Sequence, residues 1–269
     1  MKEIDLKELK RLQCEVLKAV HDFCKEEGIK YSLACGTLLG AIRHNGYIPW
    51  DDDIDIYMER ADYDRFVNSF PDNYMGHYKL VSFEKDKKWC RPYANVYDDR
   101  TIFMEHKSSI ERTIGVSIDV FPVDNVPDDE KEWMSFNKKR RLLIYIQTSK
   151  HVAFRFKNRS MGKNIVILLL KVALFPFSAH FLVKTVDKYI RRYNVIKTSR
   201  LFESACGMMQ KSPFLKSDFN ESIPHVFENY SFNIMKGYDD YLTNGFGDYM
   251  QLPPVEKRIS HHYFKAYWK

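Results

Sequence analysis

The sequence lacks acidic side chains over one long stretch. Residues 137–186 contain no Asp or Glu, although the chain of 269 residues has 36 acidic and 42 basic side chains in all. This stretch carries a charge of +11, so with a net charge of +6 the remainder of the chain carries −5. Such a division indicates a polyanionic partner, which could be anionic lipid, nucleic acid or an anionic polymer. The basic residues of the stretch are Lys138, Lys139, Arg140, Arg141, Lys150, Arg155, Lys157, Arg159, Lys163, Lys171 and Lys184.

Paired cysteines and an apolar signal region are also missing. The number of cysteines is odd, and none of them has the CxxC spacing that is typical of zinc sites. The first five residues, MKEID, do not begin an apolar signal region. We therefore expect a cytoplasmic protein without a disulfide framework or a zinc site. The five cysteines are Cys14, Cys24, Cys35, Cys90 and Cys206.

The chain length fits one large domain, or one domain with a substantial insertion. Amphipathic periodicity predicts a helix over residues 6–27 that ends at Gly28, and a second helix over residues 60–70. Alternating or β-rich runs predict strands between these helices and after them, so we expect an α+β fold with a mixed sheet. From about residue 130 the pattern becomes helical. The predicted strands are residues 29–35, 53–58, 78–83, 93–97 and 115–121.

Residues 164–183 form the most hydrophobic run, NIVILLLKVALFPFSAHFLV. A helix that spans a membrane needs about 20 apolar residues. Lys171 and Pro176 interrupt this run, and proline breaks a helix because it lacks a backbone N–H. We therefore expect a helical hairpin that is buried or lies on a membrane surface, with its break at Pro176.

An acidic segment follows Trp50. Asp51, Asp53 and Asp55 are two residues apart, so an extended chain would place them on one face and Asp52 on the other. Three carboxylates on one face repel each other unless a cation neutralises them, and hard oxygen ligands suit Mg²⁺ or Mn²⁺. The alternative is an acidic loop that is merely solvated.

Two further features favour a phosphate-handling site over a solvated loop. Gly36 and Thr37 open a predicted helix, and backbone N–H groups at a helix N-terminus can bind phosphate. A third carboxylate is available from Asp119, which stands between Ile and Val in a predicted strand, where an unpaired charge is costly. Asp124 is the alternative third carboxylate. A phosphate seat beside metal-binding carboxylates is what phosphoryl or nucleotidyl transfer requires.

Residues 34–56, ACGTLLGAIRHNGYIPWDDDIDI, resemble the LicD family of bacterial phosphocholine transferases, which are related to the fukutin-type enzymes. Residues 118–124 and 238–254 also resemble this family, and the similarity extends over about residues 10–262. The resemblance implies a nucleotidyltransferase-like mixed sheet over residues 1–130, which would form the catalytic core. Residues 131–200 would form a basic helical insertion, and residues 201–269 a C-terminal lobe that completes the active site.

The resemblance also implies roles for individual residues. Asp53, Asp55 and Asp119 would be catalytic and would bind the metal, with Gly36 and Thr37 near the nucleotide phosphates. Asn95 departs from the family, because members often carry Lys at this position, so Arg91 or Arg43 would supply the positive charge. The other predicted substrate-binding residues are Asp51, Lys257 and Arg258.

The family implies a CDP-linked donor, typically CDP-choline, and a sugar hydroxyl of a cell-surface glycan or its lipid-linked precursor as acceptor. A choline headgroup would need aromatic neighbours, and Trp50, Trp89 and Tyr93 are candidates. The basic stretch would bring the protein to the inner face of an anionic membrane. Three alternatives remain: transfer of another CDP-activated polyol or amino-alcohol phosphate, nucleotidyl transfer to RNA, and a non-catalytic membrane scaffold. Long aliphatic runs fit lipid better than nucleic acid, so we expect no nucleic-acid partner.

Overall fold

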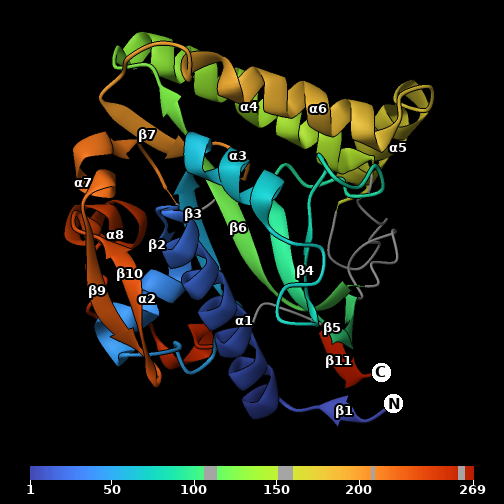
Figure 1. Cartoon of the computed structure of the whole chain (residues 1–269). Helices are drawn as coiled ribbons and strands as arrows, with labels where there is room; N and C mark the ends of the chain where they lie inside the picture. Colours follow the sequence, from blue (N-terminus) through green and yellow to red (C-terminus); the bar gives the residue numbers. More distant parts are fainter. Residues whose placement is uncertain (106–113, 151–159, 207–209, 260–263) are drawn as a thin grey trace.

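A mixed β-sheet lies at the centre of the molecule (Figure 1). The computed structural model describes residues 1–105, 114–150, 160–206, 210–259 and 264–269. Within these residues, nine strands form the main sheet. They are β1 (Glu3–Ile4), β2 (Ser32–Leu33), β3 (Asp55–Glu59), β4 (Tyr78–Val81), β5 (Ala94–Glu105), β6 (Ile114–Val126), β7 (Arg200–Glu203), β8 (Phe214–Leu215) and β11 (Phe264–Trp268).

The strand order is β1-β11-β5-β6-β3-β2, with β4 beside β5, β7 beside β6 and β8 beside β7. Strands β3 and β6 run parallel, and the other pairs are antiparallel. The predicted α+β class with a mixed sheet is therefore confirmed. Strand β6 is buried along most of its length, as expected for a strand covered on both faces.

Helix α1 (Leu6–Glu27) matches the predicted amphipathic helix. Asp5 caps its N-terminus by accepting a hydrogen bond from Glu8 N at 2.7 Å. Gly28 ends it in the left-handed conformation, with φ 62°. The apolar side of α1 packs into the core of the sheet. Helix α3 (Arg60–Ser69) also lies where the sequence predicts a helix.

The predicted strand over residues 29–35 is wrong at its end. Only Ser32 and Leu33 pair with β3, and Cys35 already begins helix α2 (Cys35–His44). The chain turns sharply here because Cys35 has φ 49° and Leu38 N donates to Ala34 O at 2.9 Å. The β-rich composition of the segment does not reveal this turn.

Three helices form a layer at the top of Figure 1: α4 (Glu130–Ser149), α5 (Met161–Ala173) and α6 (Ala179–Ile190). A short 3-10 helix, η1 (Arg191–Tyr193), follows them. Pro176 lies between α5 and α6, so the predicted break is confirmed. Among the described residues, no helix is long and apolar enough to cross a membrane. Three of the basic residues that the sequence highlighted, Arg155, Lys157 and Arg159, lie outside the described residues.

A buried ion-pair network, here called the Arg60 network, joins the helical layer to the sheet. Arg60 binds Asp124 of β6 through two hydrogen bonds of 2.7 and 2.8 Å. A third nitrogen of Arg60 lies 3.2 Å from Asp187 of α6, which also pairs with Arg191 at 2.7 Å. Asp124 is fully buried, so its carboxylate serves the fold.

The C-terminal part packs beside α2 on the left of Figure 1 through β9 and α8, while β11 lies at the lower right. It contains a two-stranded hairpin in addition to the strands that it contributes to the main sheet. Because β7, β8 and β11 belong to the main sheet, residues 201–269 are not separate from it; the division into three regions stays a prediction. The elements are α7 (Lys216–Asn220), β9 (Ser222–Phe227), β10 (Tyr230–Met235), α8 (Tyr238–Phe246) and η2 (Val255–Lys257).

Candidate active site

A row of polar side chains crosses three neighbouring strands of the sheet. The strand register sets Asp55 of β3 opposite Asp119 of β6, and Asp119 opposite Asn95 of β5. Ser117, Asp119 and Phe121 alternate along β6 and therefore share one face. All of these residues line one large cleft. The sheet thus brings together two of the three predicted catalytic carboxylates, although they are far apart in the sequence.

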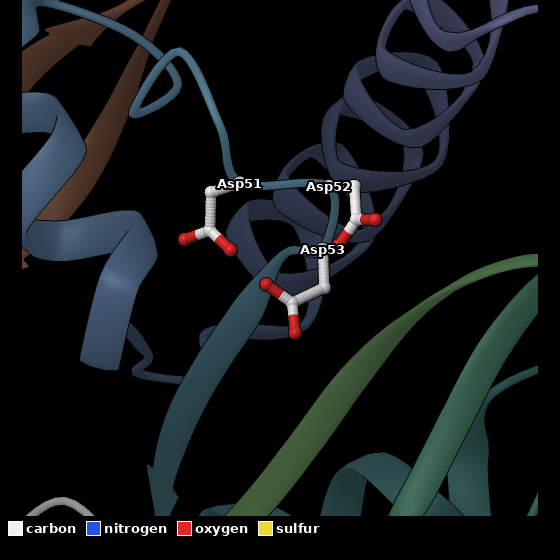
Figure 2. A group of neighbouring side chains, drawn as sticks. All are labelled: Asp51, Asp52 and Asp53. Atoms are coloured by element: carbon white, nitrogen blue, oxygen red, sulfur yellow. The ribbon is translucent and has the colours of Figure 1, made fainter. Parts of the chain in front are cut away.

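The acidic segment enters β3 next to this row (Figure 2). Asp51, Asp52 and Asp53 each offer a carboxylate oxygen, and these oxygens lie within 4.8 Å of one another. The prediction that Asp52 faces away from its neighbours is wrong. Residues 51–54 precede the strand instead of belonging to it, so the two-residue alternation does not apply to them. Asp52 is buried and belongs to the same group as Asp51 and Asp53.

Hydrogen bonds from distant elements fix the acidic segment. Gln13 of α1 donates to the carbonyl oxygen of Asp52 at 3.0 Å and to that of Ser117 at 3.4 Å. Tyr47 donates its hydroxyl hydrogen to Gln13 Oε1 at 3.0 Å. These contacts fix the backbone that carries the carboxylates, as in a preorganised site.

The N-terminus of α2 opens into the cleft at Gly36. A methyl group added at Gly36 would lie 2.5 Å from Asp51 Oδ2, so a larger side chain at this position would displace that carboxylate. The N-cap residue, Ala34, makes no side-chain cap to the helix. The positive end of the helix dipole therefore stabilises the carboxylate of Asp51, and the predicted phosphate seat is shared with that carboxylate.

Thr37 was predicted to lie near the donor phosphates, but its side chain points to the backbone of β3. It is buried and is not among the described residues that line the cleft. Its hydroxyl oxygen accepts a hydrogen bond from Asp55 N at 2.9 Å. Thr37 thus fixes the start of β3 and, through it, the position of the Asp55 carboxylate.

The pKa of Asp55 reflects its burial and the negative charge that surrounds it. Removal from water raises the pKa of Asp55 well above its ordinary value, and the carboxylates of Asp53, Asp119 and Asp51 raise it further. This is the expected behaviour of a buried carboxylate that has other carboxylates beside it.

Three guanidinium groups face the carboxylates in the same cleft. Arg91 Nη1 lies 3.9 Å from Asp119 Oδ2 and donates to the Tyr93 hydroxyl at 2.8 Å. Arg43 donates to Tyr249 O at 2.7 Å. Burial, and next the charge of Arg258, lower the pKa of Arg43, so these two cations are close enough to repel each other. A bound anion would relieve this repulsion.

Other predicted residues lie away from the cleft lining. Lys257 is exposed on η2 and does not belong to the described lining. Asp124 belongs to the Arg60 network, so Asp119 is the carboxylate of this pair that reaches the cleft. Trp89 is buried against Val183 in a separate apolar cluster. The remaining predicted residues, Gly36, Arg43, Asp51, Asp53, Asp55, Arg91, Asp119 and Arg258, all line the cleft.

Sequence reasoning missed Glu203, at the end of β7. Its side chain is buried, lines the cleft and accepts a hydrogen bond from Cys206 N at 2.7 Å. The signal was present: like Asp119, Glu203 follows apolar residues in a strand-like run. Asn95 also gains a specific role, because its side-chain amide donates to Asp119 Oδ1.

The cleft has a volume of about 1180 Å³, enough for a nucleotide-sized ligand. Aromatic rings continue its floor beyond the polar row: Phe121 lies 4.3 Å from Tyr93 and 6.1 Å from Tyr57, measured between ring centroids. Trp50 lines the cleft as well, with the guanidinium carbon of Arg258 5.7 Å from its ring centroid. Carboxylates, guanidinium groups and aromatic rings together suit a ligand with phosphate groups and a cationic or planar part.

Comparison with known proteins shows the family of the chain. A family model described as LicD/FKTN/FKRP, nucleotidyltransferase domain, matches residues 28–164. The lipopolysaccharide cholinephosphotransferase LicD of Haemophilus influenzae is 35% identical over 275 residues, which cover 99% of this chain and 99% of that protein. An uncharacterized protein of Rickettsia prowazekii is 27% identical over 211 residues, or 68% of this chain and 77% of its own. The chain therefore belongs to the LicD family and is an enzyme of the transferase class.

Proposed function

We propose that this enzyme transfers phosphocholine from CDP-choline to a sugar hydroxyl of a cell-surface glycan or of its lipid-linked precursor. The observation that carries the proposal is the convergence of acidic and basic side chains in one cleft. The relative from Haemophilus influenzae, a lipopolysaccharide cholinephosphotransferase, supports the choice of group and acceptor. We also propose that the core is nucleotidyltransferase-like, because the matching family model is described as a nucleotidyltransferase domain. The converging residues are Asp51, Asp53, Asp55 and Asp119, with Arg43, Arg91 and Arg258.

Mg²⁺, or Mn²⁺, is the cofactor that we propose. The carboxylate oxygens of Asp51, Asp52 and Asp53 lie close enough together to share a cation. The raised pKa of Asp55 marks negative charge that a cation would offset. Asp53 is common to this group and to the predicted set of Asp53, Asp55 and Asp119, so it is the ligand that we consider central. Bound there, Mg²⁺ would withdraw charge from the phosphate oxygens of the donor.

Asp119 is the residue that we propose to receive the proton of the acceptor hydroxyl, or to complete the metal site. Asn95 donates to one of its oxygens, and Arg91 lies beside the other. The acceptor oxygen would form a bond to the phosphorus next to choline, the bond from that phosphorus to the CMP oxygen would break, and CMP would leave. Asn95 is uncharged where members of the family often carry Lys, so we propose that Arg91 supplies the positive charge.

Arg43 and Arg258 are proposed to bind the diphosphate of the donor. The two cations repel each other at short range, so an anion between them gains from both. The aromatic floor at Tyr93 and Phe121, with Trp50 nearby, offers ring faces to a quaternary ammonium group.

The acceptor determines where we expect the enzyme to act. A lipid-linked glycan precursor lies at the membrane, so we propose a cytoplasmic protein that binds the inner face of the cell membrane peripherally. The basic, apolar helical layer supports this location.

The function is tested by detecting the product. Purified enzyme is incubated with CDP-choline, Mg²⁺ and a soluble acceptor glycan, and added phosphocholine is detected by mass spectrometry. Asp53→Asn should abolish transfer, while Asp72→Asn, which changes an exposed aspartate, should leave it intact. Normal turnover by Asp53→Asn would contradict the assignment of the cleft.

Donor identity is tested separately by thermal unfolding with CDP-choline, CDP-ethanolamine, CDP-glycerol and CDP-ribitol, each with and without Mg²⁺. We expect CDP-choline with Mg²⁺ to stabilise the protein most, because a ligand that binds only the folded state raises Tm. Stronger stabilisation by another donor would keep the reaction class and change the group transferred.

A further inference from the structure

Helix α5 is apolar on the side that faces solvent. Its buried side consists of Asn164 and Ile167. On the opposite side, Ile165, Leu169 and Val172 are 53%, 64% and 67% exposed. A helix on the surface of a soluble protein normally carries polar residues on its outer side. The outward side of α5 therefore needs an explanation beyond packing within the chain.

The exposed apolar side chains follow helical spacing. Met161, Ile165, Leu168 and Val172 are separated by four, three and four residues, so they form one continuous stripe. Single exposed apolar residues are common, but a contiguous patch of this kind marks an interaction site.

The stripe continues across the turn into α6. Phe175 is 85% exposed, and the rings of Phe177 and Phe181 stack with centroids 5.5 Å apart. We call the whole surface the α5–α6 apolar face. It consists of Met161, Ile165, Val166, Leu168, Leu169, Val172, Phe175, Phe177 and Phe181.

The turn that carries these aromatic rings is held from inside the protein. Lys150, at the end of α4, donates to Leu174 O at 2.8 Å and to Phe177 O. Ser178 caps α6 by accepting a hydrogen bond from Phe181 N at 3.0 Å. Because these contacts fix the backbone of the turn, the phenylalanines are presented outward and binding would have to order only their side chains.

Positive charge borders the α5–α6 apolar face. Lys163 of α5 and Lys184 and Lys188 of α6 are exposed. In the fully described helices α5 and α6, the one acidic residue is Asp187, which is buried and paired with Arg60 and Arg191. The face consequently offers cations and apolar groups to a partner and no exposed carboxylate.

The charge distribution selects the partner. A second copy of the chain would bring two sets of lysines together, and like charges at an interface disfavour that contact. An anionic lipid bilayer satisfies both properties, because its headgroups attract the lysines and its acyl region takes up the apolar side chains. Helix α5 has 13 residues, fewer than the roughly 20 that span a bilayer, so it would lie along the surface.

From these observations we infer that the α5–α6 apolar face is a docking surface for anionic lipid bilayers. This inference rests on the proposed function in placing the acceptor at a membrane, and it specifies which residues make the contact. It does not depend on the chemistry of the cleft, so the two can be tested separately.

Vesicle co-sedimentation tests the inference. The full chain is mixed with vesicles of phosphatidylglycerol and phosphatidylcholine, or of phosphatidylcholine alone, at low and at high salt. We expect binding to the anionic vesicles that weakens as salt screens the lysines. The double variant Leu169→Glu/Val172→Glu should bind at least about tenfold more weakly, because it adds negative charge and removes apolar groups.

Val226→Glu is the matched control. Val226 is 51% exposed on the β9–β10 hairpin, outside the α5–α6 apolar face, and its variant should bind vesicles as the unmodified protein does. Asp53→Asn should also bind normally, and the double variant should still modify a soluble acceptor. These two results separate failure of docking from failure of the proposed chemistry.

Two outcomes would overturn the inference directly: no binding of the unmodified protein to anionic vesicles, or equal binding by the double variant. A third outcome is a dimer in solution that the double variant converts to a monomer. In that case a second copy covers the face, and bilayer docking by this surface is wrong.

Discussion

The active-site cleft and the helical layer place their charges in opposite ways. The cleft gathers carboxylates from the acidic segment, β3, β6 and β7 at the end of a cavity. Helices α5 and α6 expose lysines and apolar side chains and bury the one acidic residue of these two fully described helices, Asp187. This contrast supports the two partners of opposite charge that we propose: a cation for the cleft, and an anionic surface for the layer.

The Arg60 network provides a third case between these regions. Here the charges are buried, but Asp124 and Asp187 pair with Arg60 within the chain, and Asp187 also pairs with Arg191. The difference teaches that buried charge by itself does not mark a functional site in this protein. The cleft differs because several carboxylates lie together there, where burial and then the neighbouring carboxylates raise the pKa of Asp55.

After the complete loss of transfer expected for Asp53→Asn, Asp119→Asn is expected to have the largest effect. It removes one negative charge from the cleft while Asn95 and Arg91 keep the site in shape. Initial rates of phosphocholine transfer should fall by about 10²–10⁴-fold, the contribution typical of a positioned proton acceptor. The circular dichroism spectrum should stay unchanged. A rate close to that of the unmodified enzyme would mean that this carboxylate takes no part in the reaction.

Asp124→Asn should lower the stability of the fold. It should affect transfer activity only indirectly, because Asp124 does not line the cleft. It removes one partner of the buried Arg60 network, which typically costs about 3–5 kcal/mol, or a drop in Tm of roughly 6 °C or more. Thermal unfolding followed by circular dichroism measures this. Lys236→Gln breaks the exposed pair of Lys236 and Glu221 and should cost less than about 1 kcal/mol. Equal effects of the two variants would refute the contrast between buried and exposed pairs.

Glu203→Gln tests whether the cleft contains a further working carboxylate. The amide can still accept the hydrogen bond from Cys206 N, so the change mainly removes charge. Because groups near a metal site tune its affinity, the Mg²⁺ concentration for half-maximal transfer should rise about 10–100-fold. Glu130→Gln, at an exposed position of α4, serves as control. An unchanged Mg²⁺ requirement would restrict the role of Glu203 to holding β7.

Asp55→Asn should have the smallest and least intuitive effect on stability. The folded-state pKa of Asp55 is raised, first by burial and then by Asp53, so its ionisation opposes folding. As pH rises from the pKa of the unfolded chain through the raised pKa, the metal-free protein should lose stability. In the presence of a chelator, the variant should unfold about 2 °C higher or more near pH 8, and the gap should shrink toward pH 5. A lower Tm for the variant at all pH values would show that the carboxylate supports the fold.

The sequence predicted the parts of the molecule that depend on local patterns. Helix α1 has its predicted limits because Asp5 and Gly28 cap an amphipathic run. The carboxylates Asp53, Asp55 and Asp119 meet at one cleft, as the resemblance to the family implied. Pro176 breaks the hydrophobic run where proline chemistry requires it.

The errors concern positions that only tertiary structure fixes. Asp52 joins its neighbours because the segment before β3 is not a strand. Thr37 turns to the backbone of Asp55 instead of lining the cleft. Glu203 enters the site through the pairing of β7 with β6, and no local pattern encodes strand register over such a distance.

The pairing of β1 with β11 bears on the order in which this protein can fold. Residues 3–4 pair with residues 266–267, and Trp268 N donates to Lys2 O at 2.9 Å. The segment that carries Tyr249 and Arg258 into the cleft comes directly before β11. During synthesis the first strand must therefore wait for nearly the whole chain to leave the ribosome. Arg258 is therefore among the last side chains to reach the cleft, whereas Arg43 and Arg91 leave the ribosome early, together with most of the aspartates.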